Sequence, residues 1–349
     1  MQLPDTLAPE PTIRLRIDEQ ALAHNWHALD RMSGKASAGA AVKANCYGLG
    51  VDACVPVLRD VGCDAFFVAH WSEVEALLPH VDAAQIAVLH GPVRDDDVRF
   101  AKATGVVPVL NSLSQVRRWN AAGGGRCHLM VDTGINRLGI ASGELGDPEI
   151  AKLDVDVLMS HLACADEDSV RNQRQLEAFR KCLPAVQHNR ASLANSAGIA
   201  LGAEFGFDLT RPGLALYGGI PRPELASIIR QVAFVDAAIM QVRTLCEGNA
   251  VGYNGEFIAP SGMRVATVSL GYADGFLRSR GPGAALQHGD ASLPVLGKVS
   301  MDMIVVDVTD APELGEGDWL HVPMHLPDEA VQSGLSQYEL LTVIGSRLR

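Results

Sequence analysis

The run Gly39-Ala-Ala-Val-Lys-Ala44 is short and apolar, which is typical of a buried β-strand. It is the first of eight such runs in the chain. The other seven occupy residues 65–69, 85–89, 106–110, 127–131, 155–159, 191–194 and 207–210. The segments between them, such as residues 71–80 and 169–183, have the length and apolar spacing of helices.

This alternation of strand and helix predicts parallel βα units, and eight such units predict a closed (β/α)8 barrel of the TIM type. A doubly wound open sheet shows the same alternation, so the strand count alone leaves both architectures open.

The pattern changes after about residue 235, where Gly, Pro and Asp interrupt short runs and helical spacing is scarce. We expect strands at residues 242–245, 264–270, 291–299 and 303–308. The sequence therefore predicts an α/β chain of two domains, a barrel over residues 1–235 and a β-rich domain over residues 236–349. The alternating run at residues 13–17 could pair with the second domain.

The composition of the 349 residues is that of a globular chain, with 48% hydrophobic and 20% charged residues. A net charge of -12 without a basic run argues against nucleic acid and anionic membranes as partners. No apolar stretch reaches the roughly 20 residues of a membrane span, and the N-terminus lacks the features of a secretory signal. Seven scattered cysteines without a CxxC pair indicate neither disulfides nor a zinc site. We expect a cytoplasmic protein.

Lys43 lies at the end of the first expected strand, and barrel enzymes carry their catalytic groups at C-terminal strand ends. Burial there can lower the pKa of the amine and favour the neutral form that a Schiff base requires. A lone lysine at this position could equally extend its ammonium group into solvent.

The sequence around this lysine, Lys43-Ala-Asn-Cys-Tyr47-Gly-Leu-Gly50, closely resembles the pyridoxal phosphate (PLP) motif of alanine racemases, which are PLP enzymes of fold type III. Further segments resemble the same family in the same order. These are Asp132-Thr-Gly-Ile-Asn-Arg137-Leu-Gly139, Met159-Ser-His161, Asn195-Ser196-Ala-Gly198, Asp208-Leu-Thr-Arg211-Pro-Gly213-Leu214-Ala-Leu-Tyr217-Gly218, Val251-Gly-Tyr253, Gly271-Tyr272-Ala-Asp-Gly275 and Ser300-Met301-Asp302-Met303. Their order over nearly the whole chain is more specific than any one segment.

The resemblance implies a PLP-dependent racemase that interconverts L- and D-alanine. Lys43 would hold PLP and act as one of two bases. Tyr253 would be the second base, supplied by the partner subunit of a homodimer. Racemisation by two bases requires one base on each face of the planar reacting carbon.

The resemblance also implies cofactor contacts. Arg211 would face the pyridine nitrogen with His161 close by, and an arginine cannot accept a proton as a carboxylate at that position would. The implied phosphate contacts are Tyr47, Ser196, Gly213 and Leu214. Independently of the resemblance, Ser196 and Gly213 follow the seventh and eighth expected strands, where barrels usually bind phosphate.

Four residues are implied contacts of the amino-acid substrate or its entrance. Arg137 and the backbone N–H of Met301 would bind the substrate carboxylate, because arginine presents paired donors. Tyr272 would line the entrance, and Asp302 would support the site from the second domain.

Four positions depart from the family's common pattern. Leu49 stands where histidine is frequent, and Lys298 replaces a frequent arginine. Met130 stands where some members carry a modified lysine that orients the arginine corresponding to Arg137. Ser346 stands at about the position where some members have another tyrosine that contacts the phosphate. These departures bear on substrate range and PLP affinity more than on the two bases.

Other functions remain open at this point. A racemase of broader specificity, or one for serine, would keep the same residues. A PLP-dependent decarboxylase of basic amino acids fits less well, because of Tyr253 and Arg211. A PLP carrier would need neither Tyr253 nor the second domain. The physiological direction, D-alanine supply or L-alanine breakdown, is open too.

Overall fold

The computed structural model describes residues 9–348, and the chain divides into two compact units. One unit is Glu19–Arg230, and the other combines the residues before Glu19 with Gln231–Arg349. Residues 1–8, where no secretory signal is expected, and Arg349 lie outside the described part. The side chain of Ser346 lies outside it as well.

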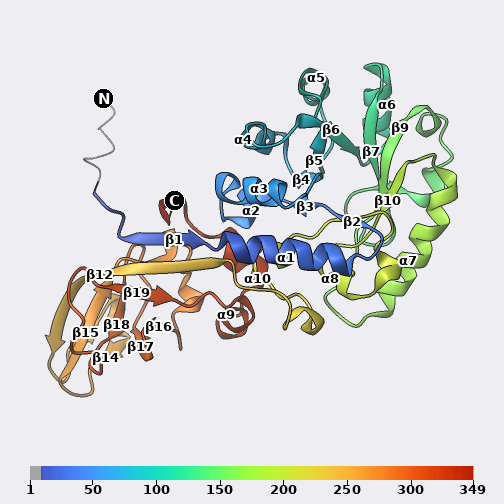
Figure 1. The fold of residues 1–349 in the computed structure, drawn as a ribbon. Helices are drawn as coiled ribbons and strands as arrows, with labels where there is room; N and C mark the ends of the chain where they lie inside the picture. Colours follow the sequence, from blue (N-terminus) through green and yellow to red (C-terminus); the bar gives the residue numbers. More distant parts are fainter. Residues whose placement is uncertain (1–8, 349) are drawn as a thin grey trace, which may run out of the picture. The chain divides into compact units, whose positions relative to one another are not determined.

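The first unit is a barrel of parallel strands (Figure 1). Its strands are β2 (Ser37–Ala38) continued by β3 (Ala40–Ala41), β4 (Phe66–Val68), β5 (Ile86–Val88), β6 (Val107–Leu110), β7 (Arg126–Asp132), β9 (Asp154–Met159), β10 (Arg190–Ser192) and β11 (Leu209–Thr210). A short additional strand, β8 (Ile140–Ala141), pairs with β7.

Two sets of backbone contacts close the barrel through β11. On one side Thr210 pairs with Ala38 of β2. On the other side the N–H of Arg211 donates to the carbonyl of Ala194 at 2.8 Å, next to β10. The predicted closed (β/α)8 barrel is therefore confirmed, and the open-sheet alternative is excluded.

Short helices connect the strands. They are α1 (Glu19–Met32), α2 (Lys43–Tyr47), α3 (Val51–Asp60), α4 (Val74–Leu77), α5 (Asp95–Thr104), α6 (Leu113–Ala121), α7 (Val170–Cys182) and α8 (Ser196–Ala200). The helix expected at 169–183 is α7, whose first turn is capped by the Ser169 hydroxyl. The helix expected at 71–80 is shorter, a 3₁₀ turn η2 (Trp71–Glu73) followed by α4.

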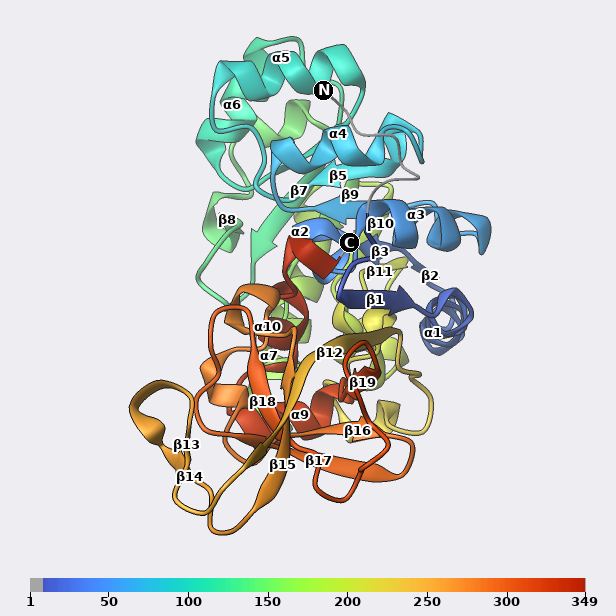
Figure 2. The ribbon, with the colours of Figure 1, turned by 90° about the vertical axis from the view of Figure 1, so that its left-hand side faces the viewer.

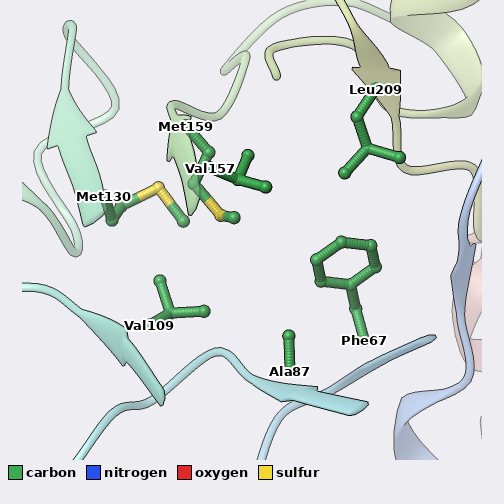
Figure 3. Close-up of a cluster of buried hydrophobic side chains, with 7 residues drawn as sticks. All are labelled: Phe67, Ala87, Val109, Met130, Val157, Met159 and Leu209. Atoms are coloured by element: carbon green, nitrogen blue, oxygen red, sulfur yellow. The ribbon is translucent and has the colours of Figure 1, made fainter. Parts of the chain in front are cut away.

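Apolar side chains from the strands fill the barrel interior (Figure 3). The cluster comprises Phe67, Ala87, Val109, Met130, Val157, Met159 and Leu209, and each is at most 7% exposed. A packed interior of this kind is what fixes the positions of the strand ends.

Charged groups lie at the N-terminal strand ends of the same barrel. The carboxylate of Asp156 accepts hydrogen bonds from Arg126 at 2.7 Å and Arg190 at 2.9 Å. Burial raises the pKa of Asp156, but the hydrogen bonds from Arg190 and Arg126 outweigh it and bring the pKa to about 2. Nearby, burial lowers the pKa of His128 to about 3, so this histidine is neutral in the folded protein at ordinary pH.

The second unit is a closed antiparallel sheet. Its strands in pairing order are β12 (Ala233–Leu245), β15 (Met263–Val268), β18 (Ile304–Asp307), β17 (Ala291–Leu296), β16 (Ala285–His288) and β19 (Trp319–Val322), which pairs again with β12. Strand β1 (Ile13–Ile17) adds to β12. A β-rich C-terminal fold was predicted and is confirmed, although the sequence did not indicate β16 and β19.

Three smaller elements complete this unit. Helices α9 (Leu326–Ser333) and α10 (Gln337–Thr342) follow β19, where the sequence showed little helical spacing. Strands β13 (Ala250–Val251) and β14 (Phe257–Ile258) form a separate hairpin that projects from the sheet (Figure 2). Among the described residues, no helix has both the length and the apolar character needed to cross a bilayer.

The neutral buried state of His128 predicts a loss of stability in acid. Unfolded chains bind a proton to histidine near pH 6.5, whereas the folded protein does so only near pH 3. The unfolded state thus binds more protons between these values, so the free energy of unfolding falls as pH falls through this range. In His128→Gln the plot of Tm against pH should be shallower. Because His161 titrates identically in both proteins, equal slopes would contradict this role of His128.

Candidate active site

The C-terminal strand ends of the barrel bring together the polar residues that the sequence singled out. Lys43 follows β3, His161 follows β9, Ser196 follows β10 and Arg211 follows β11. In a parallel barrel these ends lie on one face, where active sites form. The charges of Arg137 and Arg211 act on the pKa of both Lys43 and His161, and the charge of Lys43 acts on the pKa of His161, which requires that these groups lie near each other.

The segment that carries Lys43 has an unusual backbone. Strand β3 ends at Ala41, earlier than the predicted strand, and Lys43 begins a short turn. The next four residues, Ala44, Asn45, Cys46 and Tyr47, all have φ of 52–55°. Consecutive left-handed conformations cost non-glycine residues about 1–2 kcal/mol each, so surrounding contacts must hold the turn.

Several hydrogen bonds hold this turn. The N–H of Gly48 donates to the carbonyl of Ala44 at 2.9 Å, and Gly48 itself has φ of 91°. The side-chain oxygen of Asn45 accepts from the N–H of Val51 at 2.8 Å, at the start of α3. The N–H of Ala44 donates to the carboxylate of Glu73.

Lys43 has an amine whose pKa is lowered. Burial is the main cause, and the positive charges of Arg137 and Arg211 act in the same direction. The carboxylate of Glu73 opposes them. A lowered pKa increases the fraction of neutral amine, the form that attacks a carbonyl or accepts a proton.

Arg211 is almost fully buried, at 6% exposure, without a carboxylate partner in the described part of the chain. Its guanidinium donates to the hydroxyl of Ser192 and the carbonyl of Ser160. Burial lowers its pKa to about 10. Burial, followed by the charges of Arg211, Arg137 and Lys43, lowers the pKa of His161 to about 3. His161 is therefore neutral at ordinary pH.

Gly213 lies between Ser196 and Tyr47 and close to both. The hydroxyl of Ser196 accepts from the N–H of Gly213 at 2.9 Å and of Ala215 at 3.2 Å. Leu214 begins the 3₁₀ helix η8 (Leu214–Tyr217) between these two donors. A Cβ at Gly213 would lie 2.2 Å from the hydroxyl of Tyr47, so this position requires glycine. Hydroxyl and N–H donors thus gather at one place, as in anion sites.

Arg137 lies in the loop after β7. The carboxylate of Asp132 organises this loop by accepting from the N–H groups of Gly134 at 2.8 Å and Ile135 at 3.0 Å. The Arg137 side chain is exposed and has no hydrogen bond within residues 9–348. Met130 points into the apolar barrel interior and offers it no acceptor (Figure 3). The arginine is thus free to bind an anionic ligand.

Tyr253 belongs to the second unit and lies between β13 and β14, at the tip of the projecting hairpin (Figure 2). It is 65% exposed. The hairpin is anchored, because Val251 and Phe257, the strand pair next to the tip, pack into an apolar cluster of that unit. An ion pair of 2.7 Å between Lys298 and Glu256 lies beside the tip. A large exposed tyrosine on an anchored hairpin is suited to contact another surface.

Met301, Asp302 and Tyr272 lie together in the second unit. The carbonyl of Met301 accepts from the N–H of Ala273 at 3.0 Å, one residue after Tyr272. Arg347 donates to the carboxylate of Asp302 at 2.7 Å. The N–H of Met301 has no partner in the described part of the chain, so it can donate to a ligand.

Two residues at the barrel site had no role predicted from the sequence. Tyr217 is buried, stacks on Tyr47 with ring centroids 5.0 Å apart, and donates to the carbonyl of Ala41 at 3.0 Å. Glu73 contacts the turn after Lys43. The available signal for Glu73 was an acidic residue four positions after a predicted strand end.

Comparison with known proteins identifies the family. The family model described as the alanine racemase N-terminal domain matches residues 17–221, and that of the C-terminal domain matches residues 232–349. The chain belongs to the alanine racemase family. The enzyme class expected from the resemblance, an amino-acid racemase, is thereby confirmed.

Individual relatives are similar over nearly their whole length. The biosynthetic alanine racemase of Agrobacterium fabrum is 40% identical, covering 96% of this chain and 92% of the relative. The catabolic alanine racemase of the same organism is 38% identical, covering 96% and 90%. Since both lie at nearly equal identity, the comparison favours neither physiological direction.

Solved alanine racemases share the fold. The enzyme of Bartonella henselae, described with covalently bound pyridoxal phosphate, has a TM-score of 0.90 and 32% identity and covers 98% of this chain and 99% of its own. The biosynthetic enzyme of Pseudomonas aeruginosa has a TM-score of 0.86 and 30% identity, covering 97% and 98%.

The close approach at Gly213 predicts a specific sensitivity to substitution. In Gly213→Ala the new methyl group must displace the Tyr47 ring, which should lower the free energy of unfolding by about 1–3 kcal/mol. Urea denaturation measures this change. Gly146→Ala is the matched control in the same unit, because a Cβ there meets no atom within 4 Å. Equal stability of the two variants would show that Tyr47 is not tightly held.

Proposed function

We propose that this protein is a PLP-dependent racemase that interconverts L- and D-alanine. Membership of the alanine racemase family supports the reaction. The observation that carries the site assignment is Lys43, a lysine of lowered pKa at a strand end, surrounded by Arg137, Arg211 and His161.

The barrel residues fit PLP by their charge and donors. Arg137 and Arg211 lack carboxylate partners in the described part of the chain, and Glu73 is the one carboxylate that acts on Lys43. The positive charge of Arg211 is buried and lacks a counter-charge, which is unfavourable, so this end of the barrel favours an anionic ligand. The hydroxyls of Ser196 and Tyr47 and the N–H of Gly213 would hold the phosphate.

When bound at Lys43, PLP would supply an electron sink that makes the Cα proton of an amino acid acidic. Lys43 would then exchange that proton on one face of Cα, and Tyr253 would exchange one on the other face. Arg137 and the N–H of Met301 would orient the substrate carboxylate. Arg211, which cannot accept a proton from the pyridine nitrogen, would limit the electron sink and so disfavour side reactions.

A homodimer with shared sites is part of this proposal. The exposed Tyr253 at the tip of its hairpin supports it, since a base must be shielded from water to work efficiently. In the dimer this tyrosine would enter the partner's barrel, and Tyr272 and Asp302 would complete the entrance. We further propose that the protein acts in the cytoplasm.

The reaction is tested by conversion of L-alanine to D-alanine with PLP, with a coupled D-amino-acid assay as readout. We expect conversion by the wild type and its loss in Lys43→Ala. L-Serine and L-lysine, assayed in parallel, define the breadth of the substrate pocket. Turnover of none of these amino acids would contradict the racemase proposal, and release of carbon dioxide would assign a decarboxylase instead.

Shared sites predict complementation between two inactive variants. Lys43→Ala and Tyr253→Phe should each lose racemisation as homodimers. Coexpression with two different tags yields heterodimers in which one site carries both substitutions and the other carries neither. By the two-fold symmetry of such a dimer, the purified heterodimer should recover about half of the wild-type rate. If Tyr253 acted on its own subunit's barrel, the heterodimer would remain inactive.

A further inference from the structure

The left-handed turn after Lys43 needs a contact that fixes where it begins. Hydrogen bonds within the turn and to α3 engage the Ala44 carbonyl and Asn45 to Gly48, and the N–H of Cys46 donates to the carbonyl of Val42 at 2.9 Å, but none of them engages the N–H of Ala44. Ala44 is the first left-handed residue and follows Lys43 directly. Its N–H donates to Oε1 of Glu73, a residue 29 positions away in the sequence.

Glu73 is itself rigidly placed. Its second carboxylate oxygen accepts from the N–H groups of Ala69 and His70, both at 2.8 Å. These two residues follow β4 directly, so the carboxylate is fixed to the end of a barrel strand. One carboxylate therefore connects the end of β4 with the backbone next to Lys43.

The charge of Glu73 also bears on the lysine. Lys43 lies among positive or potentially positive groups, which are Arg137, Arg211, His161, His90 and, beyond His90, His70. Among the residues that the structure describes, Glu73 is the one carboxylate acting on Lys43, and it raises the pKa of the amine against burial and the two arginines. A glutamate that only capped the loop after β4 would need neither the third hydrogen bond nor this proximity.

We propose that Glu73 is a positioning residue for Lys43, which fixes the left-handed turn through the N–H of Ala44 and sets the charge balance around the amine. The inference rests on the proposed role of Lys43. In Glu73→Gln a side-chain oxygen can still accept from Ala69 and His70. The amide nitrogen then faces the N–H of Ala44, and two donors cannot form a hydrogen bond.

The first test uses the full-length protein freed of PLP. Competitive acetylation across a pH series, read by mass spectrometry at Lys43, reports how readily this amine loses its proton. In Glu73→Gln the midpoint of labelling should move to lower pH by about one unit, because a nearby negative charge is lost. Glu75→Gln is the matched control, since Glu75 is exposed and two residues away on α4. A midpoint in Glu73→Gln equal to that of the control would overturn the proposal.

The second test uses the PLP-loaded enzyme. A displaced lysine should lower kcat about tenfold to a hundredfold in Glu73→Gln and leave KM within about threefold, since substrate contacts are unchanged. In the plot of kcat against pH, the acidic limb should move together with the midpoint of labelling. Unchanged kcat would overturn the proposal. If Glu73 only stabilised the loop after β4, its substitution would lower Tm and leave kcat unchanged.

Glu73→Asp keeps the proposal testable if Glu73→Gln does not fold. Aspartate keeps the charge and can cap Ala69 and His70, but it is one methylene too short to reach Ala44 as well. We expect kcat to fall while the labelling midpoint stays near the wild-type value, and an unchanged kcat would count against the role. Labelling requires no racemase activity, so an inactive wild type would refute the proposed function and leave the test of Glu73 intact.

Discussion

Backbone pairing between Thr210 and Ala38 joins the last barrel strand to the first, and the whole candidate site depends on this contact. In an open sheet the two strands would lie about seven strand spacings apart, roughly 34 Å. Closure instead allows the N–H of Ala41 to donate to the carbonyl of Pro212 at 2.8 Å. Lys43 and Arg211 thereby become neighbours. A buried hydrogen bond of 2.8 Å between Ser33 and Thr210 supports the same contact.

Closure of the barrel gathers positive charges at one end, and the chain's own carboxylates offset only part of that charge. Lys43, Arg137 and Arg211 bring positive charge to one end of the barrel, and burial keeps His161 neutral. Glu73 offsets part of that charge and also holds the backbone beside Lys43. In the proposed racemase, an anionic cofactor and a substrate carboxylate would balance the remaining positive charge. Positive groups that are unfavourable without a counter-charge would thereby contribute to the binding of these anions.

The sequence predicted the architecture because its signals are local. Eight apolar runs mark eight strands, and the structure has a strand at each of them. The second unit was predicted less completely. Strands β16 and β19 have only four residues each, and each contains a histidine, which obscures alternation. The expected site residues came from the family motifs. Lys43, Ser196 and Arg211 each lie in a segment that resembles the family, and these segments occur in the family's order.

Other features had no local signal. Four consecutive left-handed residues without glycine cannot be inferred from Ala-Asn-Cys-Tyr, because the conformation is imposed by contacts from elsewhere. The hydrogen bond from Ala44 to Glu73 joins segments 29 residues apart and follows no periodic pattern. The stacking of Tyr217 on Tyr47 likewise appears only when β11 returns to β2.

The central claim is that Lys43 is the residue that carries the cofactor. The most direct measurement is reduction of the PLP-loaded protein with borohydride, followed by proteolysis and mass spectrometry of the lysine peptides. Our account predicts one phosphopyridoxyl group per chain, on the peptide that contains Lys43. A modification on another lysine, or none at all, would contradict it.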